Sequence, residues 1–379
     1  MANQPEIKAT NRKYVSETFS NVDPYYSTIQ NAIASIPVGS GGYPTSPWAV
    51  FVYPGVYNGQ VNLKTNISII GSGIQSTTIK GDGTNPAILG PSDSGNGQCY
   101  VNILTVDGNA QSGFNYPAVS SLKVNFICDV FLFTSVAPGP PQGGSGAMIP
   151  VTTVPGIAIG ALQSLNIFNL HCINQSTKFD EGIRLTGTGT LELNNSQIAY
   201  QSSYCINHQS SGSSEAWNSF LVGGACVTAT NGFVNLYVCE TVGRIEAHNS
   251  ARIRHVDSYQ AGRFIVTESG AIWVSGMSWA EEPGNDIQFE LDGPSSKIIV
   301  VNSRAKVVQN GLNVVTINSQ TALFKAMNSV IVNTGTGATI TGVSSSTPTV
   351  FLYYCSMNKD VVTVNRSPDS NYLVSANVE

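Results

Sequence analysis

The sequence predicts an all-β protein, and within that class a right-handed parallel β-helix, a solenoid of single short strands. Two observations point to this fold. Charged residues make up only 11% of the 379 residues, against about a quarter in most soluble proteins. Helical surfaces favour Glu, Lys and Arg, whereas sheets and tight turns favour Thr, Ser, Asn and Gly. The second observation is a run of short apolar segments separated by brief turns.

One segment near the N-terminus has the pattern of a helix, from Tyr26 to Pro37. Ile29, Ile33 and Ile36 recur at four- and three-residue steps and therefore share one helical face. A hydroxyl residue precedes this run as a possible N-cap, and a proline ends it. Since the open apolar end of a solenoid must be covered, we expect this short helix to cap the first coil. Packing elsewhere on the surface is the alternative.

The pattern then changes to short strands, which we expect at residues 49–53, 60–63, 67–70 and 77–79. Brief corners separate them, such as the Pro-Gly turn at residues 54–55. Strands this short with such brief corners do not form long hairpins. They suit a three-sided coil in which each strand pairs with the equivalent strand one turn later.

The second half of the chain repeats this pattern with uneven spacing. Small polar residues precede an apolar strand at residues 249–253, 268–272, 294–298 and 328–332. Asn-Ser pairs recur at predicted corners, and their asparagines are Asn195, Asn249, Asn302, Asn318 and Asn328. Asparagine tolerates left-handed backbone angles, and stacked asparagines could hydrogen-bond along the solenoid axis. Ordinary turn composition explains the same pairs equally well.

The predicted organisation is an N-terminal extension at 1–25 followed by one β-helix domain at 26–379. Three polar or Pro/Gly-rich stretches, near 84–98, 137–150 and 209–217, are expected to protrude as loops. The strand pattern resumes after each of them, so we do not interpret any as a linker between domains.

The segment from Tyr26 to Gly83 resembles the first coils of the pectin-lyase-like superfamily, and of pectin methylesterases in particular. The resemblance rests on Tyr26-Ser27-Thr28-Ile29-Gln30, Ala32-Ile33, Pro37, Val52-Tyr53-Pro54-Gly55-Val56-Tyr57, Ile67, Ile69, Gly71, Gly73, Thr78, Ile79 and Gly81. It implies the β-helix fold over about a sixth of the chain. Polysaccharide hydrolases, lyases and epimerases, phage tailspikes and viral surface proteins with no known chemistry share these features, so it implies no particular activity.

The catalytic motifs of the methylesterases are missing. That family uses an Asp in a Gln-Asp-Thr segment, an Asp in an Asp-Phe-Ile-Phe-Gly-like strand and an Arg in a Gly-Arg-Pro-Trp segment. The nearest match to the last is Gly262-Arg263-Phe264, which lacks both Pro and Trp. The resemblance therefore implies the fold and not the esterase reaction.

The charge balance and cysteine usage exclude several kinds of site. A net charge of −5 and a pI of about 5.4 exclude a broad basic nucleic-acid footprint. Residues 1–12 carry no apolar signal-peptide core, and no apolar stretch is long enough to insert into a membrane.

The seven cysteines are odd in number and form no Cys-x-x-Cys pair, so we expect buried thiols. The four histidines show no metal-ligand spacing, so no metal site and no cofactor is predicted.

The best candidate for a site is the segment from Trp279 to Gly284. Aromatic faces beside carboxylates are how proteins hold sugar rings. Trp273 and Trp279 are therefore the candidate carbohydrate-binding residues. Glu281, Glu282 and Asp257 are the candidate catalytic carboxylates. The alternative is a coil corner with a half-buried tryptophan and solvated glutamates.

A second candidate is a column of carboxylates at Glu246, Glu268 and Glu290, which are equally spaced along the chain at close to one coil length. The isoleucine pattern gives a different and shorter coil, from Ile253 to Ile272. The two registers conflict, so the equal spacing of the glutamates is also compatible with coincidence.

Two classes of function fit these observations. The first is a non-catalytic structural or attachment protein of a virus or phage particle: a β-helix spike, fibre or capsid-associated protein, expected to be a homotrimer. It would be made in the host cytoplasm, reside in the virion, and contact other particle proteins or a host surface glycan. The second is a polysaccharide-active enzyme of the pectin-lyase-like fold, such as a tailspike-type depolymerase. The missing catalytic motifs favour the first.

Overall fold

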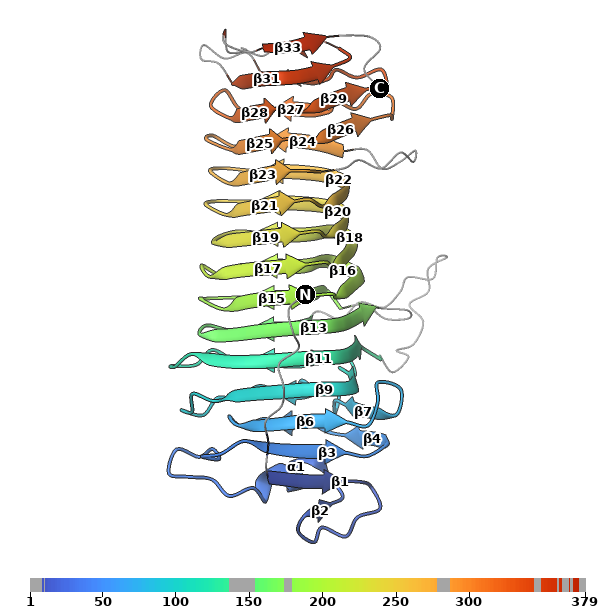
Figure 1. The fold of residues 1–379 in the computed structure, drawn as a ribbon, viewed down its shortest axis with the longest axis vertical. Coiled ribbons are helices and arrows are strands. Elements are labelled where there is room, and N and C mark those ends of the chain that lie inside the picture. Colours follow the sequence, from blue (N-terminus) through green and yellow to red (C-terminus); the bar gives the residue numbers. More distant parts are fainter. Residues whose placement is uncertain are drawn as a thin grey trace. The chain divides into compact units, whose positions relative to one another are not determined.

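The computed structural model describes residues 9, 11–135, 154–173, 179–277, 287–343, 349–359, 361–362, 368 and 371–374. Its strands pair in parallel, as in a right-handed parallel β-helix, and α1 (Ile29–Ala34) is the one α-helix in these ranges. The chain divides into two compact units, residues 1–212 (unit 1) and 213–379 (unit 2). Within each unit the strands lie one above another (Figure 1). The predicted all-β solenoid is confirmed.

Unit 1 forms a three-sided coil. Its strands are β1 (Asn11–Val15), β2 (Tyr25–Tyr26), β3 (Trp48–Val52), β4 (Gly55–Asn58), β5 (Val61–Asn62), β6 (Ile67–Gly71), β7 (Thr77–Lys80), β8 (Ile88–Leu89), β9 (Gln98–Asp107), β10 (Phe114–Tyr116), β11 (Lys123–Phe133), β12 (Pro155–Ile159), β13 (Gln163–Ile173), β14 (Glu181–Leu185), β15 (Thr190–Asn194) and β16 (Gln197–His208). One sheet runs β1-β3-β6-β9-β11-β13-β15. A second side runs β5-β8-β10-β12-β14-β16, and β4-β7-β9 begins the third.

Unit 2 repeats this arrangement. Its strands are β17 (Ser213–Trp217), β18 (Phe220–Ala229), β19 (Phe233–Tyr237), β20 (Glu240–Ala247), β21 (Arg252–Val256), β22 (Tyr259–Val266), β23 (Ala271–Ser275), β24 (Ile287–Leu291), β25 (Lys297–Val301), β26 (Arg304–Val307), β27 (Val315–Ile317), β28 (Leu323–Met327), β29 (Val330–Asn333), β30 (Ile340–Gly342), β31 (Val350–Met357), β32 (Val361–Val362) and β33 (Asn371–Val374). One sheet runs β17-β19-β21-β23-β25-β28-β31. A second runs β18-β20-β22-β24-β27-β30.

The core is made of columns of apolar side chains that repeat once per coil. In unit 2 the register stacks Val234, Ile253, Ile272, Ile298 and Phe324, and each is at most 1% exposed. Burying a side chain of this size contributes about 1.5–3 kcal/mol. The coil from Ile253 to Ile272 is shorter than the next one, from Ile272 to Ile298. The predicted repeat with uneven loops is therefore confirmed.

Helix α1 covers the first coil of unit 1. The Thr28 side chain accepts a hydrogen bond from the Asn31 amide at 3.1 Å, which is N-cap geometry. Ile29, Ile33 and Ile36 are all buried, as their spacing predicts. The helix contacts β1, β3 and β5 and lies beside the first strands in Figure 1. The capping helix is confirmed, and it is shorter than the predicted segment.

Several coil corners combine a left-handed asparagine with a buried serine, as at Ser196, Ser303 and Ser329. Four of the five predicted corner asparagines have a positive φ of 48–49°, namely Asn195, Asn249, Asn302 and Asn328. Asn318 is not among the residues with positive φ. The bonds along the axis come from the serines rather than from stacked asparagines. The Met277 amide donates to Ser303 Oγ at 3.2 Å, and the Ser303 amide to Ser329 Oγ at 3.4 Å.

Three predicted boundaries change. Strand β1 lies inside the predicted N-terminal extension yet pairs with β3, so the β-helix begins before Tyr26. Its apolar pattern is broken by Lys13, which is buried and paired with Asp23. The segment 84–98 contains β8, and the segment 209–217 contains β17. Strand β17 was missed because its inward residues, Ser214 and Ala216, are small. The predicted loop at 137–150 lies outside the described residues.

All seven cysteines are buried, as predicted, and none forms a disulfide. Burial raises the pKa of the Cys99, Cys128 and Cys226 thiols to about 12, so these groups are protonated at neutral pH. No group of three or more His, Cys, Asp or Glu within the described ranges is placed to hold a metal ion. Nor does any described helix have the length and hydropathy to cross a bilayer.

Candidate functional site

The structure describes only part of the predicted sugar site. Trp279, Glu281 and Glu282 lie outside the described residues, so their roles remain predictions. Trp273 is half-buried on β23, and Asp257 is exposed at the corner after β21. The register places Arg254 opposite Trp273, three positions before Asp257. On the neighbouring strand, the residue paired with Trp273 is therefore Arg254 and not the candidate carboxylate Asp257.

The candidate column of three glutamates does not form. Glu268 lies at a corner, with a φ of 54°, and not on a strand. Glu246 and Glu290 do share a column on the second sheet of unit 2, but Ile265 lies between them. The coil from Glu246 to Ile265 is shorter than the coil from Ile265 to Glu290, so equal spacing along the chain is not stacking. The isoleucine register was the correct one.

The first sheet of unit 2 has a distinctive outer surface, which we call the aromatic–basic face. It consists of the outward side chains of β17, β19, β21, β23, β25, β28 and β31. These strands alternate buried and accessible residues, so every second side chain points outward. Its central column is Glu215, Asn235, Arg254, Trp273, Ile299, Lys325 and Phe351.

Aromatic rings occupy many of the outward positions on this face. Trp217 and Tyr237 are directly opposed in the register, and their rings stack with centroids 4.0 Å apart. Phe233 is 48% exposed, and the guanidinium of Arg252 lies over its ring at 5.6 Å. Exposed apolar rings cost solvation free energy, so a patch of them commonly marks an interaction surface.

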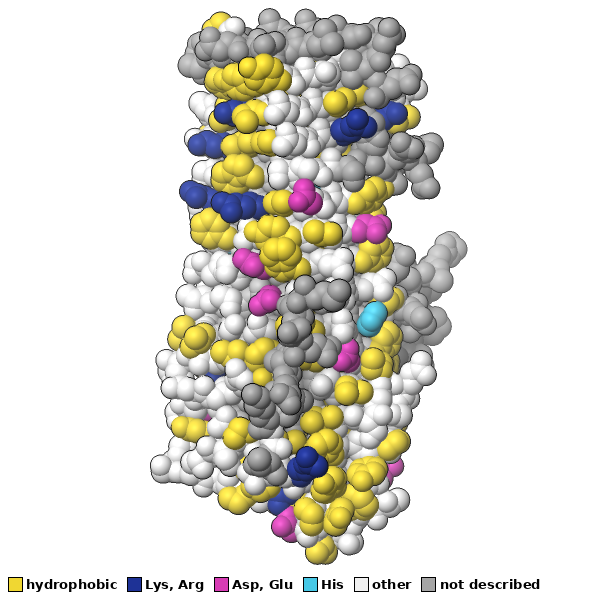
Figure 2. All heavy atoms as spheres, in the orientation of Figure 1, with side chains coloured by type: hydrophobic (Ala, Val, Ile, Leu, Met, Phe, Trp, Pro, Cys, Tyr) yellow, Lys and Arg dark blue, Asp and Glu magenta, His cyan; other side chains and the backbone are white. Residues whose placement is uncertain are grey.

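The same face carries four cations: Arg252, Arg254, Lys297 and Lys325. The single carboxylate among the strand residues is Glu215, which accepts a hydrogen bond from Asn235 at 3.3 Å. Figure 2 shows Lys and Arg atoms interleaved with hydrophobic ones along this side of unit 2. The local charge is therefore positive, although the whole chain has a net charge of −5.

The column of Glu246 and Glu290 has a different character. Glu246 Oε1 pairs with Arg244 Nε at 3.0 Å, and Oε2 lies 3.3 Å from His248 Nε2. Burial acts to raise the pKa of Glu246, but its contacts with His248 and Arg244 outweigh burial and lower the pKa. Burial and the nearby charge of Asp292 raise the pKa of Glu290. The two carboxyls thus have opposite tendencies to hold a proton.

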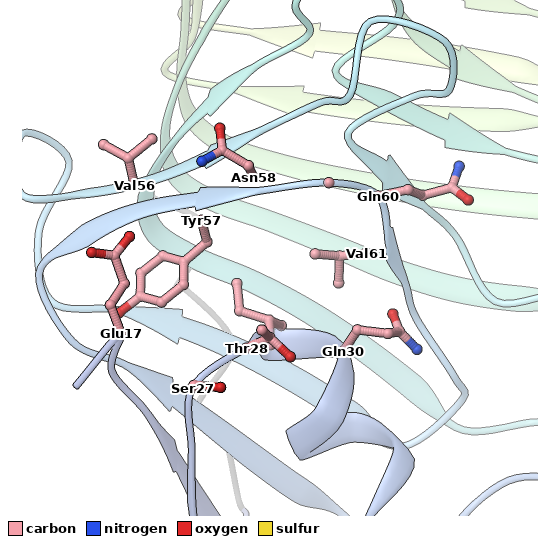
Figure 3. Close-up of a pocket in the computed structure, with 11 residues that line it drawn as sticks. Glu17, Ser27, Thr28, Gln30, Val56, Tyr57, Asn58, Gln60 and Val61 are labelled. Carbon is pink, nitrogen blue, oxygen red and sulfur yellow. The ribbon is translucent and has the colours of Figure 1, made fainter. Parts of the chain in front are cut away.

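A cleft of about 340 Å³ lies beside α1 in unit 1. Figure 3 shows Glu17 and Tyr57 close together on one side, with Gln30 on the other. Two of its polar side chains are hydrogen-bonded to the backbone. The Tyr57 hydroxyl donates to the Tyr53 carbonyl at 2.9 Å, and Gln30 Oε1 accepts from the Asn62 amide at 2.9 Å. This cleft lies where the helix meets the first coil, and these two hydrogen bonds give Tyr57 and Gln30 a structural role.

The sequence interpretation missed the basic residues of the face. A signal was present, because Arg252 and Arg254 flank the inward Ile253, and Lys297 precedes the inward Ile298. When the sequence is aligned so that Ile253 and Ile298 occupy the same inward column, Arg252 and Lys297 also fall in one outward column. The charge fraction of the whole chain concealed this local concentration.

No protein-family model matches the sequence, and no curated protein is similar to it. Several solved structures share its fold. ORF18 of Geobacillus virus E2 superposes with a TM-score of 0.47 at 15% identity, over 77% of this chain. This chain covers 61% of the length of ORF18. The A-module of mannuronan C-5 epimerase AlgE6 from Azotobacter vinelandii has a TM-score of 0.39 at 14% identity, covering 93% of this chain and 95% of the module.

Pectin methylesterase from carrot superposes with a TM-score of 0.28 at 12% identity. The superposition covers 98% of this chain and 88% of the esterase. At such identities a likeness is one of fold alone. The parallel pairing of the strands of this chain gives the β-helix architecture that the resemblance in residues 26–83 implies.

Proposed function

We propose that this protein is a non-catalytic attachment protein of a virus or phage particle and that unit 2 binds a surface glycan through its aromatic–basic face. The observation that supports this is the outward row of rings and cations on one sheet. Aromatic rings stack on sugar rings, and Arg and Lys donate hydrogen bonds to sugar oxygens. Trp273, a candidate sugar-binding residue from the sequence, is one of these outward rings.

The proposal extends to assembly and location. The protein would be a homotrimeric spike, fibre or capsid-associated component of the virion. Mass spectrometry of purified particles should detect it, and sedimentation of the purified protein should give three times the 40.1 kDa mass of the chain. Absence from particles would contradict the location, and a monomeric mass would contradict the trimer.

The binding role is tested on a glycan array with the full chain. We expect selective binding by the wild type and at least a tenfold loss of affinity in Trp217→Ala/Trp273→Ala, because aromatic contacts dominate many recognition surfaces. Phe19→Ala, in unit 1, is a matched aromatic control that should bind like the wild type. Equal binding by the wild type and the double variant would contradict a role for this face.

A second function is favoured by one observation, the opposite pKa tendencies of Glu246 and Glu290. Two rungs of about 4.8 Å separate their strands, near the roughly 6.5–9.5 Å between carboxyls of inverting glycosidases. In such a reaction Glu290 would protonate the leaving oxygen as the glycosidic bond breaks. Glu246 would take a proton from the water that adds to the anomeric carbon.

Product analysis distinguishes the two functions. The wild type is incubated with host surface polysaccharides, and new reducing ends are measured. Cleavage that falls by about a hundredfold in Glu246→Gln or Glu290→Gln would establish the enzyme. The assay includes Glu281→Gln and Glu282→Gln, which test the predicted site outside the described residues. We expect no cleavage by the wild type.

A further inference from the structure

We propose that the aromatic–basic face is specific for an acidic polysaccharide, one with carboxylated sugars, that lies across successive coils of unit 2. This inference rests on the proposed glycan-binding function and names the class of its ligand. The placement of the four cations relative to the rings supports it.

Cations and apolar side chains share one column along the solenoid axis. In the central column, Arg254 on β21 is followed by Trp273 on β23, Ile299 on β25 and Lys325 on β28. Each step is one strand spacing of about 4.8 Å, which is comparable to the length of one sugar unit in an extended polysaccharide. A glycan along this column would meet a cation, a ring, an aliphatic side chain and a second cation.

A neighbouring column adds two more cations in register with the first. Arg252 lies on the same strand as Arg254, and Lys297 lies two rungs further along the Arg252 column. Arg252, Arg254 and Lys297 are exposed, so their donors are accessible. A guanidinium pairs with a carboxylate through two parallel hydrogen bonds, which neutral sugars do not offer. The spacing therefore favours a ligand with a negative charge on several of its sugars.

A second copy of the chain is a poorer occupant of this face. If two copies met through the same face, four cations of one would approach four of the other, with Glu215 as the one strand carboxylate on each side. Like charges at an interface are costly and suppress association. Charge complementarity therefore favours an anionic ligand over self-association through this face.

The test measures binding of the full chain to a panel of carboxylated capsular polysaccharides and to the carboxyl-reduced form of each. We expect the native polymers to bind and the reduced forms to bind at least tenfold more weakly. The affinity for the native polymers should fall as salt is added, because salt screens exposed charges (about 10 Å Debye length at 0.1 M).

Two double variants give a matched comparison. Arg252→Gln/Arg254→Gln removes two cations of the face and should weaken binding at least tenfold. Arg304→Gln/Lys306→Gln removes two cations with the same spacing from β26, which belongs to another sheet of unit 2, and should change binding less than twofold. Thermal unfolding of both variants checks that each is folded.

The outcomes separate this inference from the proposed function. Equal binding of native and reduced polymers, with loss in Trp217→Ala/Trp273→Ala only, would overturn the acidic ligand and leave glycan binding intact. Binding of no polymer in the panel or the array would overturn both. Tighter binding to single-stranded DNA than to any carboxylated polymer would also overturn the inference, since it would identify a general polyanion site.

Discussion

The two units build the same coil and cover it with different chemistry. In unit 1 the outward residues of β9, β11, β13 and β15 form a central column of Tyr100, Phe126, Asn166 and Glu192. The flanking positions carry amides, hydroxyls and apolar groups, and no Lys or Arg points outward from these strands. The corresponding positions of unit 2 carry four cations.

The difference indicates which residues the fold needs. Inward columns of Ile, Leu, Val and Phe occur in both units and exclude water from the core. These four strands of unit 1 form without outward cations, so a sheet of this solenoid does not require the cations that unit 2 carries. Exposed charges contribute little to stability. This is the physical reason for assigning the aromatic–basic face to binding rather than to folding.

The largest loss of stability should come from substitutions in the apolar core, which both units have. Phe264→Ala in unit 2 and Phe114→Ala in unit 1 each remove a ring that is 0% exposed. We expect each to lower the free energy of unfolding by about 3–5 kcal/mol, because a cavity replaces the lost contacts. Urea unfolding of both variants measures it. A loss below about 1 kcal/mol in one variant alone, well under the usual cost of such a cavity, would show that the two cores are not equivalent.

Acid should destabilise both units by a similar amount. Burial lowers the pKa of His255 in unit 2 to about 3 and that of His208 in unit 1 to about 4. Both values are below the unfolded pKa of about 6.5, so the stability contributed by the neutral rings is lost as the pH falls below that value. At pH 5 each histidine should cost about 2 kcal/mol relative to pH 7. Unfolding of His255→Gln and His208→Gln across this range measures it, and each variant should show a shallower pH dependence than the wild type.

A smaller effect is expected at the corners. Ser258 Oγ accepts from the Cys239 amide at 2.9 Å and donates to the Val256 carbonyl at 2.7 Å. Ser258→Ala leaves a buried amide without its partner and should cost about 1–3 kcal/mol. Ser258→Cys should cost less, because Cys239 and Cys355 make sulfur contacts of this kind at other corners. Equal losses for the two variants in thermal unfolding would indicate that packing, and not the bond, matters.

The smallest effect on stability should come from the outward cations of unit 2, which the matching strands of unit 1 lack. Arg254→Asn gives unit 2 the residue type that Asn166 supplies in the central column of unit 1. We expect the free energy of unfolding to change by at most about 0.5 kcal/mol, while affinity for the carboxylated polysaccharide falls. A stability loss above about 2 kcal/mol, which exposed substitutions rarely cause, would show that this cation supports the fold.

The sequence by itself determined the class of fold, the capping helix and the left-handed corners. Each of these depends on a local pattern. The spacing of Ile29, Ile33 and Ile36 specifies one helical face, and asparagine tolerates a positive φ that most residues avoid. The buried cysteines follow from their apolar neighbours in the same way.

Only the tertiary structure decided which outward side chains lie together. The coils of unit 2 differ in length, so equal distances along the chain do not give equal positions on a sheet. For this reason the evenly spaced Glu268 is not in line with Glu246, and Trp273 meets Arg254 instead of Asp257. Strand pairing fixes these neighbours because a register shift of one residue would move the inward column out of the core. The inward isoleucines therefore determine the register, and the register assembles the face.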